Sequence, residues 1–440
     1  MEVNKYIFRE YDIRGKVEED FPSEVVVNLG KAFGTFIKRS GGQEIALSGD
    51  VRLSTPELIN QFKEGVLSTG VDVINIGIVP TPVNYYSMFK LDVAGAVQIT
   101  GSHNPPEFNG FKMSRNKKSV FGESIQNLRD IIENEDFENG TGDEAPYKIL
   151  PDYKKMISSK IELNKKLKVV LDCGNAAGAV CAPEIFRTLN IELEELYCDV
   201  DGTFPNHHPD PTVEENLKDL IEKMKTGRYD VGIAFDGDAD RAVFIDDKGN
   251  VISGSMMTTL ISDYLSKENN NLKVVHNVNV SPHALSVLND RNIQLYRCKV
   301  GHSNIKKMMR EIDADFGGEH SAHFYYKENF YADSAILTLL IFMKIISTKE
   351  EKVSRVFENY KFPPSSGEIN FVVKDVEESL RNVEEVFDVD FDYLDGLTCF
   401  TENYWFNIRG SNTEPKLRVN VEGRSEKVIT EVLEKISSNI

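Results

Sequence analysis

The feature that most constrains this sequence is an alternation of short apolar segments with stretches of helical spacing, which occurs three times along the chain. The first occurrence predicts a strand, a helix, a strand, a helix and a strand, in the order 44–48, 56–69, 71–76, 85–89 and 93–99. A second alternation covers residues 167–235, and a third covers residues 256–346. Such alternation is typical of parallel sheets whose connecting helices cover their faces. The sequence therefore predicts an α/β fold with three consecutive domains of similar plan, each built on a parallel or mixed sheet.

The composition changes after Pro363 and Pro364, where the regular alternation ends. The remaining residues predict a strand, a helix, two strands and a final helix, in the order 368–373, 376–387, 405–408, 417–422 and 426–436. This order indicates a small C-terminal α+β domain. We therefore predict four domains around a central cleft, with the boundaries 1–147, 148–250, 251–363 and 364–440. Residues 133–147, rich in Asp, Glu, Asn and Gly, are predicted to form a linker.

The chain of 440 residues carries 51 Lys and Arg against 70 Asp and Glu, which gives a formal net charge of −19. This excess of negative charge argues against nucleic acid and anionic membranes as partners. The five cysteines are odd in number and form no CxxC pair, which is typical of a reducing compartment. The N-terminus lacks the apolar core of a signal peptide, and the longest apolar run, residues 335–346, is too short to span a bilayer. We expect a cytoplasmic protein.

The predicted strand at 93–99 leads into a turn with the sequence Thr100-Gly101-Ser102-His103-Asn104-Pro105. The prolines prevent a helix from continuing there, and Gly101 permits a tight bend that exposes the Ser102 hydroxyl. The neighbouring His103 can hydrogen-bond an oxyanion. Most serines in such positions only cap a turn, so that alternative stays open for this loop taken alone.

A second strand end, after residues 230–235, carries the carboxylates of Asp236, Asp238 and Asp240. Carboxylates this close repel one another unless a cation neutralises them, which indicates a site for a hard divalent ion such as Mg²⁺. An EF-hand is excluded because Arg241 and Asp247 stand where its loop requires Gly and Glu. A solvated acidic turn is the alternative.

Two further loops offer polar side chains for a sugar phosphate. Glu319, Ser321 and His323 alternate in sequence, so an extended backbone would place all three on one side, where they could contact sugar hydroxyls. A loop of the C-terminal domain combines guanidinium groups, hydroxyls and an amide that could cradle a phosphate: Arg409, Ser411, Asn412, Thr413 and Arg418. An ordinary strand edge and a capped turn are the respective alternatives.

Ligands of parallel α/β sheets bind outside the carboxyl ends of the strands, so the three strand-end loops could face one cleft. The chain has no glycine-rich dinucleotide fingerprint after its first strand, no Walker lysine and no G-x-S-x-G elbow. His207 and His208 stand between Pro205 and Pro209 like a pair of metal ligands. Because no third ligand is apparent, we interpret this segment as a rigid turn.

The four loops, in this order, resemble those of the α-D-phosphohexomutase family, and the resemblance covers essentially the whole chain. Its carriers are the segments Thr100 to Pro105, Asp236 to Arg241, Gly318 to His323 and Arg409 to Thr413. The Glu-His-Ser-Ala-His form of the third loop, with Phe8 to Gly15 at the start of the chain, is similar to the phosphomannomutase/phosphoglucomutase branch.

The resemblance implies a role for each group of residues. Ser102 would carry a transferable phosphoryl group, and one Mg²⁺ would be bound by Ser102, Asp236, Asp238 and Asp240. The residues implied around the reacting phosphate are Tyr11, Arg14, His103, Lys112 and Arg241. The residues implied for the sugar are Glu319, Ser321 and His323, with Gly301 and His302 as a further substrate-contact pair. The non-reacting phosphate would be held by Arg409, Ser411, Asn412, Thr413 and Arg418.

The activity implied by the resemblance is reversible exchange between hexose 1-phosphate and hexose 6-phosphate, with mannose, glucose or both as the sugar. A hexose 1,6-bisphosphate would serve as intermediate and activator, and small sugar phosphates would be the partners of a monomer or weak homodimer. Asn279 stands where some bifunctional members have a substrate-contacting lysine, so the sugar stays open. The alternatives are a phosphoglucosamine mutase, a Mg²⁺-dependent sugar phosphatase and a non-catalytic sugar-phosphate sensor. The fourth domain is predicted to close as a lid.

Overall fold

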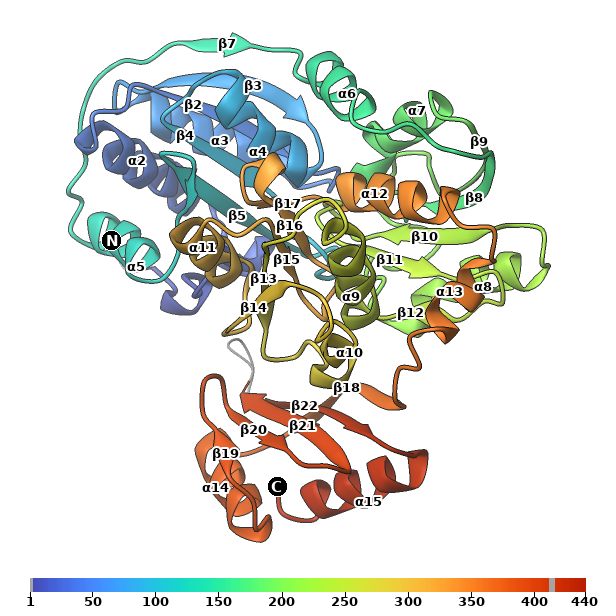
Figure 1. Ribbon diagram of the computed structural model, residues 1–440. Helices are drawn as coiled ribbons and strands as arrows, with labels where there is room; N and C mark the ends of the chain where they lie inside the picture. Colours follow the sequence, from blue (N-terminus) through green and yellow to red (C-terminus); the bar gives the residue numbers. More distant parts are fainter. Residues whose placement is uncertain (1–2, 411–415) are drawn as a thin grey trace. The chain divides into compact units, whose positions relative to one another are not determined.

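The computed structural model describes residues 3–410 and 416–440. The chain forms two compact units, which we call the first unit (residues 1–252 and 332–354) and the second unit (residues 253–331 and 355–440). Figure 1 shows the helices and strands along the chain. Among the described residues, no helix combines the length and apolarity needed to cross a membrane.

The first sheet of the first unit is mixed and has the strand order β1-β5-β4-β2-β3-β7, with β6 paired to β5. Its strands are β1 (Ile13–Lys16), β2 (Glu44–Gly49), β3 (Asp72–Ile78), β4 (Gly95–Ile99), β5 (Phe108–Arg115), β6 (Lys118–Ser119) and β7 (Glu144–Pro146). The predicted strands at its centre run parallel, whereas β5 returns antiparallel to β4. The predicted linker at 133–147 is wrong at its end, because β7 pairs with β3 and extends this sheet.

Helices cover both faces of this sheet because its central strands present apolar side chains to both sides. The helices are α1 (Val17–Asp20), α2 (Ser23–Arg39), α3 (Thr55–Leu67), α4 (Thr81–Lys90) and α5 (Glu123–Glu133), after the 3₁₀ turn η1 (Lys5–Ile7). Leu47 and Val97 face the core formed with α2, α3 and α5. Ala46 and Ala96, one residue earlier, face Tyr85 of α4 on the other side. This arrangement is the one expected of a two-sided α/β sheet.

The second sheet of the first unit has the order β12-β11-β10-β8-β9. Its elements are α6 (Leu150–Ser158), β8 (Leu167–Asp172), η2 (Ala177–Val180), α7 (Ala182–Arg187), β9 (Ile191–Leu196), η3 (Glu214–Leu217), α8 (Lys218–Lys225), β10 (Val231–Phe235), β11 (Ala242–Ile245) and β12 (Val251–Ile252). Later in the chain, β17 (Ala332–Asp333) and α12 (Ala335–Ser347) rejoin this unit, where Phe342 packs against Phe244 of β11.

The second unit contains the third α/β domain and the C-terminal domain. The third domain has α9 (Gly254–Leu265), β13 (Leu272–Asn277), α10 (Pro282–Ser286), β14 (Ile293–Cys298), α11 (His302–Ile312), β15 (Phe316–Gly318), β16 (Phe324–Tyr326) and η4 (Lys327–Asn329). After α13 (Val353–Glu358), the C-terminal domain has β18 (Ser365–Val372), α14 (Val376–Val386), β19 (Phe391–Asp392), β20 (Leu397–Phe400), β21 (Tyr404–Gly410), β22 (Lys416–Gly423) and α15 (Glu426–Ser437). Its sheet, in the order β18-β22-β21-β20-β19, is antiparallel throughout. The predicted class of three α/β domains followed by a smaller C-terminal domain is confirmed.

Candidate active site

The loop that carries Ser102 leaves the carboxyl end of β4 and returns into β5. Ser102 has a backbone φ of 49°, in the left-handed region that non-glycine residues rarely adopt. Its amide nitrogen donates to Oγ1 of Thr100 at 2.8 Å. That hydroxyl donates in turn to Asp50 at 2.8 Å, and the amide of Gly101 donates to the same carboxylate oxygen at 3.2 Å. The buried Asp50 thus helps to hold the backbone conformation that presents the serine.

The acidic loop joins β10 to β11, which pair antiparallel up to Phe235 and Ala242. The six residues between them form a tight turn in which Ala239 has a φ of 56°. The turn gathers the carboxylates of Asp236, Asp238 and Asp240, each offering one oxygen, within 4.8 Å of one another. All three side chains are buried, so their charges are not screened by bulk water.

The serine loop and the acidic loop come from different sheets and lie in contact within the first unit. Oγ of Ser102 lies 3.2 Å from a carboxylate oxygen of Asp236. A Cβ atom at Gly237 would overlap the backbone carbonyl oxygen of Ser102, so only glycine permits this approach. The structure therefore brings Ser102 together with the carboxylates that the sequence nominated as metal ligands.

Three basic residues named from the sequence surround the same point. Nζ of Lys112, on β5, lies 2.6 Å from Asp238 and 2.5 Å from Asp240. Nε of Arg241 donates to Asp236 at 3.0 Å. Arg14, on β1, pairs with Asp12 and donates to the Asn104 side chain of the serine loop at 2.5 Å.

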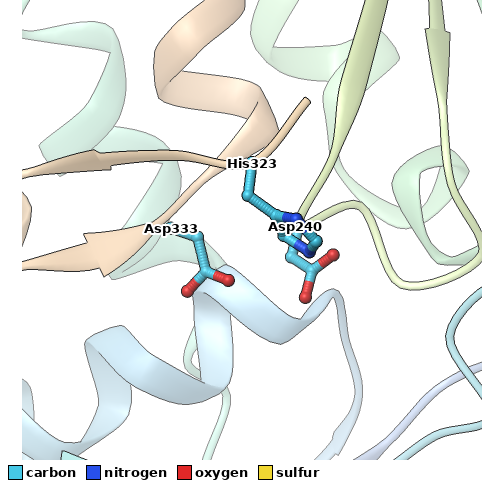
Figure 2. A group of neighbouring side chains, drawn as sticks. All are labelled: Asp240, His323 and Asp333. Carbon is cyan, nitrogen blue, oxygen red and sulfur yellow. The ribbon is translucent and has the colours of Figure 1, made fainter. Parts of the chain in front are cut away.

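The electrostatics of the cluster favour a further cation. Burial, followed by the neighbouring Asp240 carboxylate, raises the pKa of Asp236 to about 8. Asp333, fully buried at the end of β17, adds another carboxylate whose oxygen lies within 4.8 Å of Asp240 (Figure 2). Burial alone would lower the pKa of Lys112, but Asp238 and Asp240 outweigh burial and raise it. Negative charge therefore exceeds what the nearby ammonium and guanidinium groups balance.

The acidic cluster also fits the ligand chemistry of a hard divalent ion. Oδ1 of Asp238 is buried and has no hydrogen-bond partner among the residues that the structure describes. A buried carboxylate oxygen without a donor is costly, and a cation would remove this cost. Mg²⁺ prefers carboxylate and hydroxyl oxygens and keeps room for further oxygen ligands. Residues present here therefore fit such an ion.

His103 lies at the margin of this cluster. Nδ1 of His103 lies 3.2 Å from Oγ of Ser102. Burial, with the nearby guanidinium groups of Arg241 and Arg14, holds the pKa of His103 well below its usual range, so its imidazole is neutral at pH 7. Tyr11 is half-buried in the turn that precedes β1.

In the second unit, the residues predicted to contact the sugar lie in a turn rather than on an extended strand. β15 ends at Gly318, and residues 319–323 reverse the chain into β16, with Ala322 at a φ of 67°. The prediction of an extended backbone is therefore wrong. The turn nevertheless gathers the three side chains, because Nδ1 of His323 lies 3.0 Å from Ser321 Oγ and 3.3 Å from a Glu319 oxygen.

Glu319 is the centre of this second group of side chains. Its buried carboxylate accepts hydrogen bonds from the amide of Gly301 at 3.2 Å, the side chain of Asn277 at 3.0 Å and the hydroxyl of Tyr325 at 2.7 Å. Burial opposes ionisation, but the hydrogen bond and charge of His323, with the Tyr325 hydroxyl, outweigh it and lower the pKa of Glu319. The predicted contact residue Gly301 thus adjoins Glu319, and His302 follows at the start of α11.

Two arginines of the C-terminal domain face each other across neighbouring strands. Arg409 of β21 and Arg418 of β22 are register partners. Like charges placed opposite each other are destabilising unless an anion compensates them. Glu368 of β18 approaches Arg409 at 3.5 Å and Arg418 at 2.9 Å. The guanidinium groups of these two neighbouring strands offer charge-assisted donors that suit an anion such as a phosphate. The predicted partners Ser411, Asn412 and Thr413 lie outside the described residues.

Sequence reasoning missed Thr81, Asp50 and Asp333. Thr81 donates to the carboxylate of Asp238 from its hydroxyl at 2.5 Å and to the Asp238 carbonyl from its amide at 2.9 Å. A usable signal was present, because Pro80-Thr81-Pro82 marks a helix start directly after the strand β3. A strand end of the first sheet would have placed Thr81 beside the other loops.

Comparison with known proteins identifies the family. Four family models match consecutive parts of the chain: the phosphoglucomutase/phosphomannomutase alpha/beta/alpha domains I, II and III at residues 5–139, 151–249 and 253–362, and the C-terminal domain at residues 368–438. The chain belongs to the phosphoglucomutase/phosphomannomutase family. The α-D-phosphohexomutase resemblance seen in the sequence is thereby confirmed.

Several phosphoglucomutase/phosphomannomutase family proteins resemble this chain over nearly its full length. A phosphomannomutase/phosphoglucomutase of Pseudomonas aeruginosa is 36% identical over 432 residues, which are 97% of this chain and 93% of the relative. A phosphomannomutase of Methanocaldococcus jannaschii is 34% identical over 444 residues, which are 99% of this chain and 97% of the relative. The crystal structure of a family protein from Burkholderia thailandensis, 31% identical, matches with a TM-score of 0.93 over 100% of this chain and 97% of its own.

Proposed function

We propose that this family member interconverts hexose 1-phosphates and hexose 6-phosphates through a phosphorylated Ser102 and a hexose 1,6-bisphosphate, with mannose and glucose as the sugars. The observation that carries the proposal is the position of the Ser102 hydroxyl, 3.2 Å from Asp236, within a buried cluster of carboxylates and cations. The curated relatives named for this activity support the same reaction.

One Mg²⁺, held by Ser102, Asp236, Asp238 and Asp240, would neutralise charge on the transferring phosphoryl group. Three basic side chains would also stabilise negative charge on the phosphoryl group. Arg241 and Lys112 are fixed by the acidic loop, and Arg14 is fixed by Asp12 and by the serine loop. Fixed cations stabilise the phosphoryl oxygens without reorganising during the reaction.

In the first half-reaction, an oxygen of the sugar attacks the phosphorus of phospho-Ser102. A new P–O bond forms to the sugar, the bond to Ser102 Oγ breaks, and the proton of the sugar hydroxyl passes to a base. The bisphosphate then turns around and returns its other phosphoryl group to Ser102 by the reverse of these bond changes. The serine oxygen gains a proton when it leaves and loses one when it attacks.

Three side chains of the proposed site could act as bases, namely His103, Lys112 and His323, and the first is best suited to the serine proton. Its neutral imidazole lies 3.2 Å from Ser102 Oγ. Lys112 is less suited, because the two carboxylates raise its pKa and keep its ammonium protonated. His323, bonded to Ser321, stays the candidate for a proton on the sugar.

The second unit would supply recognition. Glu319 is ionised and can accept hydrogen bonds from sugar hydroxyls. The guanidinium groups of Arg409 and Arg418 would bind the phosphate that does not react. The proposed reaction requires the Ser102 cluster and these recognition residues to engage the same sugar phosphate. The four predicted domain ranges, the lid movement, the cytoplasmic location and the monomer or weak homodimer remain predictions of this proposal.

A coupled assay tests the proposal. The enzyme is supplied with Mg²⁺, a trace of glucose 1,6-bisphosphate, and mannose 1-phosphate, glucose 1-phosphate or glucosamine 1-phosphate in turn. We expect the 6-phosphates of mannose and glucose to appear. Conversion of the amino sugar alone would select the phosphoglucosamine mutase, and release of inorganic phosphate without isomer formation would select the phosphatase. Binding without either product would select the sensor.

A further inference from the structure

Arg52 lies in the turn between β2 and α3 and is almost completely buried, with 2% of its surface exposed. Its guanidinium group has five N–H donors, and the structure gives each of them an acceptor. The acceptors are the carbonyl oxygens of Ser102 at 2.8 Å, Asn104 at 2.6 Å, Pro105 at 2.7 Å and Phe108 at 3.0 Å, and a carboxylate oxygen of Asp50 at 3.2 Å. Four of the five donors therefore bind the backbone of the serine loop.

Among residues 102–105, the carbonyl oxygen of His103 is not bound by Arg52, but it accepts a hydrogen bond from another side chain. Nε2 of His208 lies 2.5 Å from the carbonyl oxygen of His103, and a carbonyl can only accept, so Nε2 carries the proton. The carbonyl oxygens of residues 102, 103, 104 and 105 are thus all bound by side-chain donors. The segment interpreted from the sequence as a rigid proline turn supplies this contact.

Contacts with the second α/β domain also hold the two donor side chains, Arg52 and His208, in place. His207 bonds to Asp172 at 3.0 Å through Nε2 and to the carbonyl of His208 at 3.0 Å through Nδ1, which anchors the turn to the end of β8. The guanidinium of Arg52 lies 5.4 Å from the ring centre of Phe204, within the range of a cation–π contact. Arg52 is therefore held between the serine loop and the second domain.

This arrangement has an electrostatic consequence for a phosphorylated serine. A backbone carbonyl that faced the phosphoryl group would repel it, because both carry negative charge. Carbonyl oxygens bound by buried donors cannot turn toward it without leaving those donors unpaired, at high cost. The same bonds hold Ser102 at its unusual φ of 49°.

We propose that Arg52, assisted by His208, is a positioning residue for phosphoryl transfer, which fixes the serine loop so that Ser102 Oγ stays beside the acidic cluster. Arg52 touches neither sugar nor phosphate in this role, and the proposal rests on the mutase activity proposed above. Misplacing a reacting group by about 1 Å can lower a rate about a hundredfold. The turnover should therefore depend on Arg52 while substrate binding does not.

The test compares Arg52→Lys and Arg52→Ala with the wild type, at a temperature where each is folded by circular dichroism. Lysine keeps the charge but offers only three donors, so we expect kcat to fall about 10- to 100-fold in both variants. KM for the hexose 1-phosphate should change less than about threefold. Added guanidinium ion should partly restore kcat in Arg52→Ala, because it can occupy the space left by the side chain. Leu29→Ala, a core change in α2, is the control for lost stability and should show neither the fall nor the rescue.

Two outcomes would overturn the role of Arg52: an unchanged kcat in the lysine variant, or a fall in kcat that is matched by Leu29→Ala and not rescued. If Arg52 variants fail to fold, His208→Gln is assayed instead, with a smaller expected fall in kcat of about fivefold to tenfold from the loss of one bond. Amide hydrogen exchange of residues 101–108 gives a readout independent of sugar chemistry, and it should quicken in each variant. A wild type inactive on every sugar, with faster exchange in the variants, would remove the proposed function and leave the loop restraint standing. Unchanged exchange would remove the restraint itself.

Discussion

The two groups of functional side chains differ in how they are held. In the first unit, the buried Ser102 hydrogen-bonds Asp236, and the buried Lys112 hydrogen-bonds Asp238 and Asp240 of the same acidic loop. In the second unit, Glu319 and Arg409 are buried as well, whereas the side chains of Arg418 and Glu368 are 34% and 27% exposed. We expect the enclosed network around Ser102 to serve the bond changes of the proposed reaction, and the second-unit side chains, of which Arg418 and Glu368 are accessible, to hold the substrate. Substitutions in the first unit should lower kcat, and those in the second should raise KM.

The largest effect is expected at the serine itself. Ser102→Ala removes the oxygen proposed to carry the phosphoryl group, so kcat should fall at least about a thousandfold. Intact-mass measurement after incubation with glucose 1,6-bisphosphate should find no phosphoryl group on the variant. Ser40→Ala, an exposed position at the end of α2, is the control and should be phosphorylated as the wild type is. Activity near the wild-type level in Ser102→Ala would exclude phosphoryl transfer through Ser102.

Removal of the divalent ion should have the next largest effect. Treatment with EDTA should lower kcat about a hundredfold or more, and added Mg²⁺ should restore it, because the phosphoryl oxygens lose their main counter-charge. Asp238→Asn should weaken Mg²⁺ binding, so the Mg²⁺ concentration needed for half-maximal activity should rise. Asp130→Asn removes one exposed carboxylate from α5 and should leave that concentration unchanged. Full activity in EDTA would contradict the proposed role of the acidic cluster.

A change in the second unit should act on binding instead. Arg409→Ala removes the charge-assisted contact proposed for the non-reacting phosphate, so KM for hexose 1-phosphate should rise about 10- to 100-fold. Phosphorylation of Ser102 should persist in this variant. Arg424→Ala, which breaks an exposed pair with Glu402 in the same domain, should leave KM unchanged. Loss of phosphoserine in Arg409→Ala would show that the division between the units is wrong.

The smallest effect concerns the pH dependence of stability, to which two histidines contribute with opposite signs. Burial lowers the pKa of His276 in the second unit to about 4, whereas the Asp172 carboxylate outweighs burial and raises the pKa of His207 in the first unit. Below pH 6.5 an unfolded histidine gains a proton that folded His276 does not take, so the stability of the second unit falls as the pH falls toward 4. The contribution of His207 is present below pH 6.5 and is lost as the pH rises through its raised value.

The single tryptophan, Trp405, lies in the second unit and reports its unfolding by fluorescence. Between pH 7.5 and pH 5.5, His276 should account for about 1 kcal/mol of lost stability. The unfolding midpoint of the wild type should therefore fall about 3 °C further than that of His276→Gln over this interval. Equal falls in the two proteins would contradict the pKa direction given for His276.

Most helices and strands of the chain could be predicted because local signals define them. The helix at Ser23–Arg39 has both an apolar stripe and a proline directly before it, and the strand at Leu167–Asp172 has a continuous apolar run, residues 169–171, at its centre. The turn at residues 319–323 was misread because alternation of polar residues fits a strand equally well. Nothing in that pattern reveals that Ala322 adopts a positive φ.

The acidic loop and the serine could likewise be nominated from local sequence, but their surroundings could not. Lys112 reaches the acidic loop only because β5 returns antiparallel beside β4, which no spacing in the sequence specifies. Arg52 lies 50 positions before Ser102. Nothing in its neighbours Val51 and Leu53 indicates that its side chain binds the serine loop. Long-range contacts of this kind arise from tertiary pairing and have no local signature.

The backbone angle at position 102 also explains why the proposed phosphoryl carrier is a serine rather than a threonine. Both residues offer a hydroxyl, but threonine carries a second branch on Cβ, and branched side chains are strongly disfavoured at a φ near 49°. Glycine would relax the angle and lose the oxygen. Serine is the smallest residue that satisfies both demands, so the conformation of the loop itself selects the chemistry of the group that it presents.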